Sequence, residues 1–465
     1  MSFRLSDLVE ATGGRLVGGD AAITLERLVT DSRQAGPGAL FVALAGETTD
    51  GHAFIPTAAE AGATALLAES LPEGTEVPAV LVPDTKEALV DFTQHQLARQ
   101  PIKVVGVTGS AGKTSTKEMI AAVLSRRYEV LKTEGNLNTY TGLPISVALL
   151  EPRHQVFVAE YAMSAPGEIA LLSRMAPPDI AVVLNVGLAH AGMPGLGSVE
   201  AVAAAKRELV EALTADGTAV LNGDDPRVRA MASAAGGESL FFSAYAADDD
   251  GGHTPQVRAE GIRLRGLHGS DFELVLPSGR VPVRLQVPGE HAVSNALAAA
   301  TTGYALEVPV ADIAAALGAF APVTGRMVLR RGRKGSTLID DTYNASPAAV
   351  EAALAVLLAE RDRPRLAVLG DMLELGDAAV EAHRRIGAAA AGADLLVAVG
   401  AMSGEIRAGA LEAGMPADSV AEAAVDDVAA LVEPRLQDAL VLVKGSRAVA
   451  LETVVAALVE PEAGR

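Results

Sequence analysis

Alternation of strand, turn and helix most constrains what this chain can fold into. From Ile102 to Thr108 the sequence reads IKVVGVT, a run rich in β-branched residues, and a glycine-rich turn and a helical segment follow directly. The same order recurs around the strands QVFVAEY, DIAVVLNV and TAVLNGD. Such runs are typical of strands buried on both faces of a parallel sheet, joined by right-handed helical crossovers. The pattern therefore predicts an α/β fold built on a P-loop-type parallel sheet.

The length and the changes in pattern predict three domains. At 465 residues the chain exceeds what one compact core usually holds. Residues 1–98 mix short strands with Gly/Pro turns, which predicts a small α/β module, and residues 99–321 form a larger predicted central domain. Residues 322–465 repeat the alternation and predict a Rossmann-like domain after a linker near 321–326. Residues 244–288 interrupt the central pattern and predict an antiparallel hairpin with a structural role.

Charge and composition limit the partners. The formal net charge of −20 argues against a nucleic-acid partner, because phosphate backbones are bound by basic faces. The chain has no cysteine, which excludes disulfides, cysteine-ligated zinc and thiol nucleophiles. The first residues, MSFRLSDLVEATGG, contain no apolar signal segment, and no uncharged apolar stretch of about 20 residues occurs. We therefore expect a cytoplasmic monomer without a membrane span.

A glycine-rich loop after the first central strand predicts a nucleotide site. Its glycines let backbone N–H groups turn towards phosphate oxygens, and the following helix N-terminus adds partial positive charge. Lys113 is placed to reach the terminal phosphates and the Thr114 hydroxyl to bind Mg²⁺. Val107 stands where the strict P-loop motif has its first glycine, so the loop is a variant. The residues predicted to bind ATP here are Thr108, Gly109, Ser110, Ala111, Gly112, Lys113, Thr114 and Ser115.

Polar residues follow the ends of later strands. Glu160 ends one strand, and Asn185 and His190 come after another. Ligands bind at the carboxyl edge of parallel sheets, so with Thr114 these groups form a set that suits a divalent cation beside ATP phosphates. A histidine that only hydrogen-bonds within the fold, or an acid that only caps a helix, is the structural alternative. Lys206 lies in the helical VEAVAAAKRELVEAL, and on chemistry alone it belongs to a solvated helical face.

The last domain contributes a second polar set. Asp341 ends a strand in DDTYNASP, where nucleotide-binding sheets present a carboxylate to ribose hydroxyls. Asn344 and Ser346 follow it, and capping of the next helix is their structural alternative. Arg326, at the domain junction, could bring a guanidinium onto phosphate.

Taken in order, the motifs resemble the Mur ligase family over about residues 30–452. They include TGSAGKTSTKE, GNLNTYTGLP, NVGLAHAGMPG, GEHAVSN, DDTYNASP, LGDMLELG and KGSR, and DSRQAGPGALFVAL with DGHAF resembles the family's UDP-binding module. The chain looks most like members that add D-alanyl-D-alanine to UDP-N-acetylmuramoyl-tripeptide. The alternative is the sister ligase that adds a diamino acid to the dipeptide precursor, whose Asp-Asn-Pro-Arg type motif is not found here. A P-loop switch or motor ATPase, and a non-catalytic UDP-sugar-binding relic, are the rivals from other classes.

The resemblance implies a ligase of peptidoglycan precursor synthesis that works through an acyl phosphate. It implies ATP and two Mg²⁺ ions as cofactors, with Lys113, His190 and Lys206 as catalytic residues. Lys206 is expected to be carbamoylated and to bind metal together with Thr114, Glu160 and His190. The other implied ATP-binding residues are Asn295, Arg326 and Asp341, and the implied substrate-binding residues are Asp31, Ser32, Arg33, Asn136, Asn138, Asn344 and Ser346, with the Lys444–Arg447 loop as a further candidate.

Overall fold

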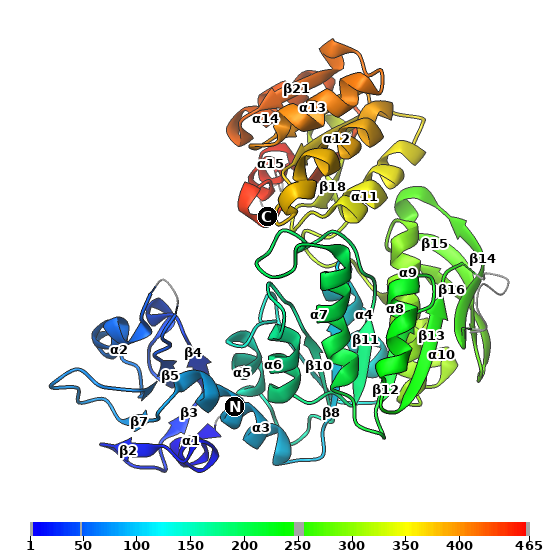
Figure 1. Cartoon of the computed structure of the whole chain (residues 1–465). Helices are drawn as coiled ribbons and strands as arrows, with labels where there is room; N and C mark the ends of the chain where they lie inside the picture. The colour runs from blue at the N-terminus through cyan, green and yellow to red at the C-terminus, as the bar shows by residue number, and fades with distance from the viewer. Residues whose placement is uncertain (1–2, 47–48, 246–254, 462–465) are drawn as a thin grey trace.

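The computed structural model describes residues 3–46, 49–245 and 255–461, and its N-terminal part is a small α/β unit (Figure 1). The sheet has the order β2-β7-β6-β5-β4, in which only the edge strand β2 runs antiparallel to its neighbour. A short antiparallel pair, β1 with β3, lies apart from it. The strands are β1 (Phe3–Arg4), β2 (Arg15–Val17), β3 (Thr24–Leu25), β4 (Arg27–Val29), β5 (Ala39–Val42), β6 (Ala65–Ala68) and β7 (Ala79–Leu81). The helices are α1 (Leu5–Thr12), α2 (Ile55–Glu60) and α3 (Thr85–Ala98).

Helix α3 attaches this unit to the centre of the molecule. It contacts α1 on one side and the central helices α5 (Gly142–Val147) and α6 (Glu168–Met175) on the other. Leu89 and Phe92 of α3 share one hydrophobic cluster with residues of both parts. Because α3 packs on both sides, the boundary predicted after residue 98 falls at the end of a shared helix and stays a prediction.

The central unit is a nine-stranded sheet in the order β16-β15-β14-β13-β12-β11-β8-β10-β9. In this order, every neighbouring pair between β14 and the edge strand β9, including both pairs of β8, is parallel. The pairs β14–β15 and β15–β16 are antiparallel. The strands are β8 (Lys103–Thr108), β9 (Val130–Lys132), β10 (Val156–Glu160), β11 (Ile180–Val183), β12 (Thr218–Asn222), β13 (Glu238–Ser243), β14 (Val257–Leu264), β15 (Ser270–Leu276) and β16 (Gly279–Leu285). The remaining helices are α4 (Lys113–Leu124), α7 (Val199–Glu211), α8 (Pro226–Ala230), α9 (Glu290–Ala305) and α10 (Val310–Ala319).

Both faces of this sheet are covered, as the continuous apolar runs predict. Phe157 and Val158 are adjacent in β10, yet they belong to two different hydrophobic clusters because successive side chains point to opposite faces. The cluster of Phe157 includes residues of α5, α6 and α7, and that of Val158 includes residues of α4, α9 and α10. The antiparallel addition predicted within 244–288 is β14–β16, and the part of the Asp/Gly-rich loop at 246–254 lies outside the described residues.

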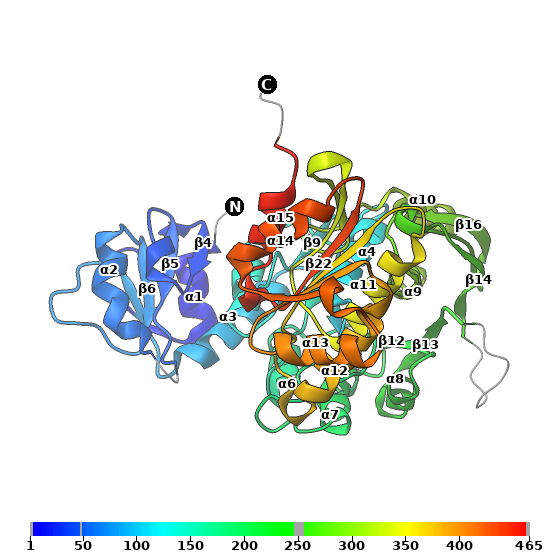
Figure 2. The same cartoon turned by 90° about the horizontal axis from the view of Figure 1, so that it is seen from above.

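The C-terminal unit is a doubly wound sheet that lies over the central one, while the N-terminal unit lies to one side (Figures 1 and 2). Its order is β17-β18-β22-β19-β20-β21, with only β17 antiparallel. This matches the Rossmann-like pattern of the sequence. The strands are β17 (Val328–Arg331), β18 (Thr337–Asp341), β19 (Arg365–Gly370), β20 (Leu395–Val399), β21 (Val420–Ala423) and β22 (Leu440–Lys444). The helices are α11 (Pro347–Ala359), α12 (Ala379–Ala389), α13 (Ser403–Glu412), α14 (Val428–Val432) and α15 (Glu452–Leu458).

Across the described ranges, the model contains no helix with both the length and the apolar character needed to cross a membrane.

Close packing of α12 on α13 yields a test of the C-terminal unit. A Cβ added at Gly409 would lie 1.9 Å from the Arg384 carbonyl oxygen, so Gly409→Ala should force the helices apart and lower the free energy of unfolding by about 1–3 kcal/mol. Gly404→Ala, in the same helix, is the control: its Cβ would meet nothing closer than Glu422 at 3.8 Å. That change should be neutral or stabilise by up to about 1 kcal/mol. Urea unfolding of both variants measures the difference, and equal effects would contradict the packing argument.

Candidate functional site

The glycine-rich loop joins the end of β8 to the start of α4. Gly112 precedes α4 with a φ of 82°, a conformation that glycine adopts without a Cβ clash. A Cβ at Gly112 would also lie 2.6 Å from Oδ1 of Asn295 on α9, so the predicted adenine-side residue packs directly against the loop. Thr108 contributes its backbone to the sheet, and its buried hydroxyl donates to the Tyr161 carbonyl at 2.9 Å.

Asn185 holds this loop in shape from the end of β11. Its Oδ1 accepts from the Ala111 N–H at 2.8 Å, and its Nδ2 donates to the Ala111 carbonyl at 3.1 Å. Its own carbonyl accepts from the Ser110 N–H at 3.0 Å. The sequence groups Asn185 with the cation-binding set, but the structure engages both polar ends of its side chain with the loop backbone.

A buried hydrogen-bond chain lies beside the loop. The Thr114 hydroxyl donates to Oε2 of Glu160 at 2.7 Å, and Nδ2 of Asn138 donates to Oε1 of the same carboxylate at 2.9 Å. Glu160 is 3% exposed. The guanidinium of Arg326 donates to the Thr114 hydroxyl at 2.7 Å, although the two residues are 212 positions apart in the chain. Three residues predicted separately from the sequence, Thr114, Glu160 and Arg326, are therefore in one chain of contacts.

Lys113 begins α4 and points back into the loop. Its Nζ donates to the Gly109 carbonyl at 2.7 Å. Burial lowers the pKa of Lys113, and the nearby Glu160 carboxylate opposes that shift. The amine is therefore already in the loop where phosphate oxygens would bind.

Lys206 is buried, which contradicts the solvated helical face that its residue pattern favours. It is 0% exposed because its side of α7 packs against the central sheet, where Ala205 and Leu209 join the cluster. Within the described part of the chain, its Nζ has no hydrogen-bond partner. Burial holds the pKa of Lys206 well below its ordinary value, and the Lys113 cation adds to the shift.

His190, in the loop after β11, lies near both lysines. Burial lowers its pKa, and Lys113 and Lys206 lower it further through their charges. Its Nδ1 is 2.7 Å from Oε2 of Glu374, which comes from the C-terminal unit. Sequence reasoning assigned no role to Glu374; the available signal was its place in LGDMLELG, just after a strand that ends at the carboxyl edge of its sheet.

Asp341 and its neighbours form the C-terminal side of the site. Oδ2 of Asp341 pairs with Nζ of Lys444 at 2.6 Å, and Oδ1 accepts from the Met327 N–H at 3.2 Å. Lys444 also donates to the Asn344 carbonyl at 2.9 Å. Ser346 occupies the N-cap position of α11, but its side chain makes no capping hydrogen bond, which weakens the structural alternative for that residue.

The other predicted substrate residues are dispersed. Asn138 contacts Glu160, whereas Asn136, two residues earlier, is exposed. Asp31, Ser32 and Arg33 follow β4 in the N-terminal unit, away from the loop (Figure 1). Asp31 and Arg33 form an exposed ion pair at 2.7 Å. The structure thus gathers the ATP and metal candidates at one sheet edge and leaves the predicted UDP residues on another unit.

Available metal ligands are few. In residues 3–46, 49–245 and 255–461, no group of three or more His, Cys, Asp or Glu side chains is arranged to hold a metal. The donors beside the loop are the Thr114 hydroxyl, the Glu160 carboxylate and the His190 ring. This sparse, oxygen-rich set suits Mg²⁺, which keeps several waters and binds through one or two carboxylates plus substrate phosphates.

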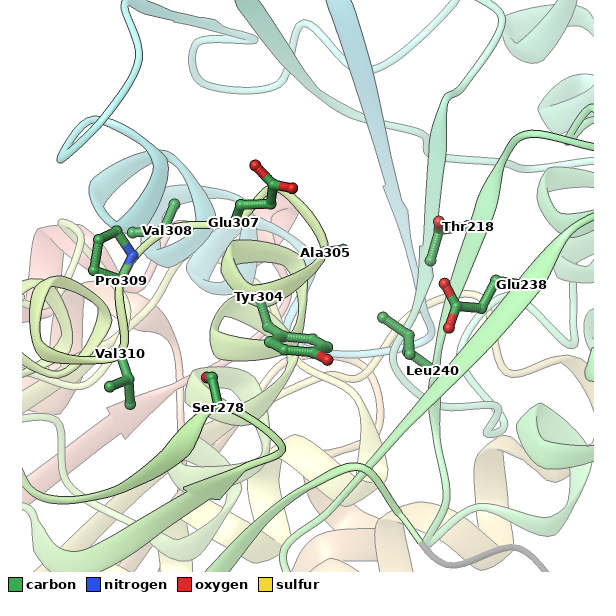
Figure 3. Close-up of a pocket in the computed structure, with 10 residues that line it drawn as sticks. All are labelled: Thr218, Glu238, Leu240, Ser278, Tyr304, Ala305, Glu307, Val308, Pro309 and Val310. Carbon is green, nitrogen blue, oxygen red and sulfur yellow. The ribbon is translucent and has the colours of Figure 1, made fainter.

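A cavity of about 450 Å³ lies elsewhere, beside the first residues of β12 and β13 (Figure 3). Thr218 and Glu238 line it from the amino edge of the sheet, and Tyr304 lies between them and Val310. None of the predicted site residues lines this cavity. It lies at the opposite edge from the phosphate loop and is not the candidate site.

The contacts of Asn185 predict that the loop is shaped before nucleotide binds. Asn185→Ala should leave the loop backbone without these hydrogen bonds and weaken ADP binding by roughly tenfold. The reason is that a loop already ordered before binding loses less conformational entropy when ADP binds. Isothermal titration with ADP measures the change. Asn136→Ala, on an exposed loop position, is the matched control and should bind ADP as the unaltered protein does. An unchanged affinity in Asn185→Ala would contradict this role.

Family models match nearly the whole chain. The Mur ligase family catalytic domain matches residues 24–134, the Mur ligase middle domain residues 107–303, and the Mur ligase glutamate ligase domain residues 325–447.

Individual relatives agree with the family models. The chain is 37% identical to the UDP-N-acetylmuramoyl-tripeptide–D-alanyl-D-alanine ligase of Escherichia coli K12, over 99% of each chain. The crystal structure of MurF from Acinetobacter baumannii is similar with a TM-score of 0.87 at 31% identity, over 98% of each chain. MurF ligase from Thermotoga maritima in complex with ADP is similar with a TM-score of 0.79 at 30% identity, over 93% of this chain and 96% of that one. By its sequence and its fold, the chain belongs to the Mur ligase family.

Proposed function

We propose that this protein is an ATP-dependent ligase that joins D-alanyl-D-alanine to the free carboxylate of UDP-N-acetylmuramoyl-tripeptide, in peptidoglycan precursor synthesis. The observation that carries the proposal is the near-complete correspondence, in both directions, with a ligase of that name. The correspondence includes the N-terminal unit, and the alternative function of a switch or motor ATPase does not explain why the chain has that unit.

The reaction needs activation because a carboxylate is a poor electrophile. A carboxylate oxygen of the tripeptide takes the terminal phosphoryl group of ATP, which gives an acyl phosphate and ADP. The amine of D-alanyl-D-alanine then attacks the carbonyl carbon and loses a proton, and phosphate leaves as the amide forms. The protein's task is to position these groups and to neutralise the charge on the transferring phosphoryl group.

The phosphate loop and Arg326 supply that neutralisation. We assign the terminal phosphates to the Lys113 amine and the N-terminal turn of α4, while the Ser110 and Ala111 N–H groups donate to Asn185 and hold the loop in shape. Arg326 reaches the same place from the domain junction, where its guanidinium stacks 4.2 Å from the Tyr343 ring and donates to Thr114. Asn295 serves the adenine side and Asp341 the ribose. A ribose contact for Asp341 requires that its carboxylate accept from the hydroxyls while Lys444 remains paired with it.

Mg²⁺ fits the donors around the loop, and when bound it offsets charge on the phosphates and the developing acyl phosphate. Thr114, Glu160 and His190 would hold it. In the present arrangement, both Glu160 oxygens accept from neutral donors, so the carboxylate keeps its negative charge available to a cation.

Carbamoylation of Lys206 would complete the metal set. The buried amine has no hydrogen-bond partner in the described structure, and burial lowers its pKa, which favours the neutral, nucleophilic form. The amine nitrogen would add to the carbon of CO₂ and release a proton, which gives a carbamate anion. That anion would pair with the nearby Lys113 and provide the oxygen ligands for a second Mg²⁺. An unpartnered buried amine is costly, and the modification removes that cost.

The three units divide the substrates between them. We assign the UDP end to residues 1–98, with Asp31, Ser32 and Arg33 as contacts, and ATP to residues 99–321. Residues 322–465 then supply the ribose contact of Asp341 and bring in the dipeptide. The remaining assignments are Asn136 and Asn138 to the tripeptide, and Asn344, Ser346 and the Lys444–Arg447 loop to D-alanyl-D-alanine.

Product analysis tests the proposal directly. The protein is supplied with ATP, Mg²⁺ and UDP-N-acetylmuramoyl-tripeptide, with and without D-alanyl-D-alanine, while phosphate release and peptide mass are followed. We expect a product heavier by one dipeptide unit only when all substrates are present. Product from the dipeptide precursor and a diamino acid would instead assign the sister activity. Phosphate release that needs neither peptide would indicate a switch ATPase.

The Lys206 carbamate has its own test. Lys206→Ala should lower kcat by at least about a hundredfold, because a metal ligand that neutralises charge is lost. ¹³C NMR after equilibration with labelled bicarbonate should show a carbamate carbon in the unaltered protein and in Lys103→Ala, an exposed-lysine control. The signal should be absent from Lys206→Ala. Full activity of Lys206→Ala, or an unchanged signal, would contradict the modification.

A further inference from the structure

The central and C-terminal units meet tightly next to the metal candidates. The Gly192 N–H donates to the Glu374 carbonyl at 2.8 Å. A Cβ added at Gly192 would lie 2.1 Å from the Gly376 nitrogen, so the two backbones touch with no room for a side chain. Two residues before Gly192, the His190 ring binds the Glu374 carboxylate. The contact therefore couples a loop of each unit at the level of both backbone and side chain.

Both residues of this side-chain pair have unusual backbones. His190 has a φ of 71° and Glu374 a φ of 65°, in the left-handed region that residues with a Cβ seldom adopt. Such conformations are strained and persist where the surroundings over-determine them, most often at functional sites. Here the two strained residues belong to different units and bind each other, which points to a function for the pair.

The hydrogen bond selects one form of the histidine. An ionised carboxylate only accepts hydrogen bonds, so a neutral His190 bound to Glu374 carries its proton on Nδ1 and keeps the Nε2 lone pair free. The geometry of this pair therefore leaves Nε2 as the ring nitrogen that can bind a metal ion.

We propose that Glu374 is a positioning residue for the metal site: it holds the His190 ring with Nε2 available to Mg²⁺, and it does so only while the C-terminal unit is docked. The inference rests on the proposed metal role of His190. Docking of the C-terminal unit and completion of the metal site are then one event, because the residue that orients the ligand comes from that unit. Carboxylates that orient metal-binding histidines in this way typically change metal affinity or activity 10–100-fold when they are mutated.

A second contact between the same units provides the control. Oε1 of Glu360, just after α11, accepts from the Leu267 N–H at 3.3 Å, and Leu267 packs into a hydrophobic cluster of the C-terminal unit. Leu267 lies between β14 and β15, so the antiparallel extension of the central sheet also contacts the C-terminal unit. Glu360 therefore contributes to docking and has no hydrogen bond to the phosphate loop, His190 or the lysines among the described contacts.

The experiment compares Glu374→Ala, Glu374→Gln and Glu360→Ala with the unaltered protein. Mn²⁺ is the probe ion, and its affinity is measured by electron paramagnetic resonance of the free ion, with a non-hydrolysable ATP analogue and UDP-N-acetylmuramoyl-tripeptide present. We expect Glu374→Ala to bind Mn²⁺ about 10–100-fold more weakly and kcat to fall by a similar factor, with KM for the UDP substrate within about twofold. Glu374→Gln keeps an acceptor oxygen without the charge, so its loss should be intermediate.

Glu360→Ala should bind Mn²⁺ within about twofold of the unaltered protein. Equal Mn²⁺ affinity in the unaltered protein and Glu374→Ala would overturn the proposal. An equal loss in Glu360→Ala would overturn it as well, since docking alone would then explain the effect. Thermal melting checks that each variant is folded, and Glu374→Gln replaces Glu374→Ala if the latter is not. The Mn²⁺ measurement needs no product, so a failure of the ligase assay is distinguishable from a failure of this inference.

Discussion

Parallel pairing of β8 with β10 and β11 brings three chain segments to one edge of the central sheet. Val107 lies opposite Glu160, and Thr108 lies opposite Val183, so the loops after these strands emerge at the same level. The phosphate loop, the Glu160 carboxylate and the segment that carries Asn185 and His190 are neighbours for this reason alone. Further groups of the site are added to this edge by α7 and α9, which cover opposite faces of the sheet, and by the C-terminal unit.

Burial of charge is the cost of this arrangement. Lys206, Lys113 and Glu160 lie in the same region, and Lys206 has no hydrogen-bond partner within the described structure. A lone buried amine is unfavourable unless it becomes neutral or gains an anion. Both substrates of a phosphoryl-transfer reaction bring anions to this place, and a carbamate on Lys206 would bring another. The electrostatics of the site thus favour the ligands that the proposed reaction requires.

The C-terminal unit completes the site through only a few contacts. Arg326 reaches Thr114, and Glu374 reaches His190, both from beyond the central unit. Interfaces between units of one chain are commonly mobile, and closure that assembles a site also excludes water from a reactive acyl phosphate. The antiparallel strands β14–β16, for which the sequence predicted only a structural role, contact the same unit through Leu267.

The sequence by itself determined the α/β fold, the phosphate loop and the strand-end position of Glu160. These features depend on residues that are close together in the chain, namely the apolar run of a strand buried on both faces and the glycines of a tight turn. Family resemblance supplied the proposed role of Lys206, which composition and periodicity do not contain. Only the tertiary structure decided that Lys206 is buried, that Asn185 shapes the loop, and that Glu374 binds His190 from 184 residues away. Those contacts depend on how one unit packs against another, and no local pattern of polar and apolar residues specifies that packing.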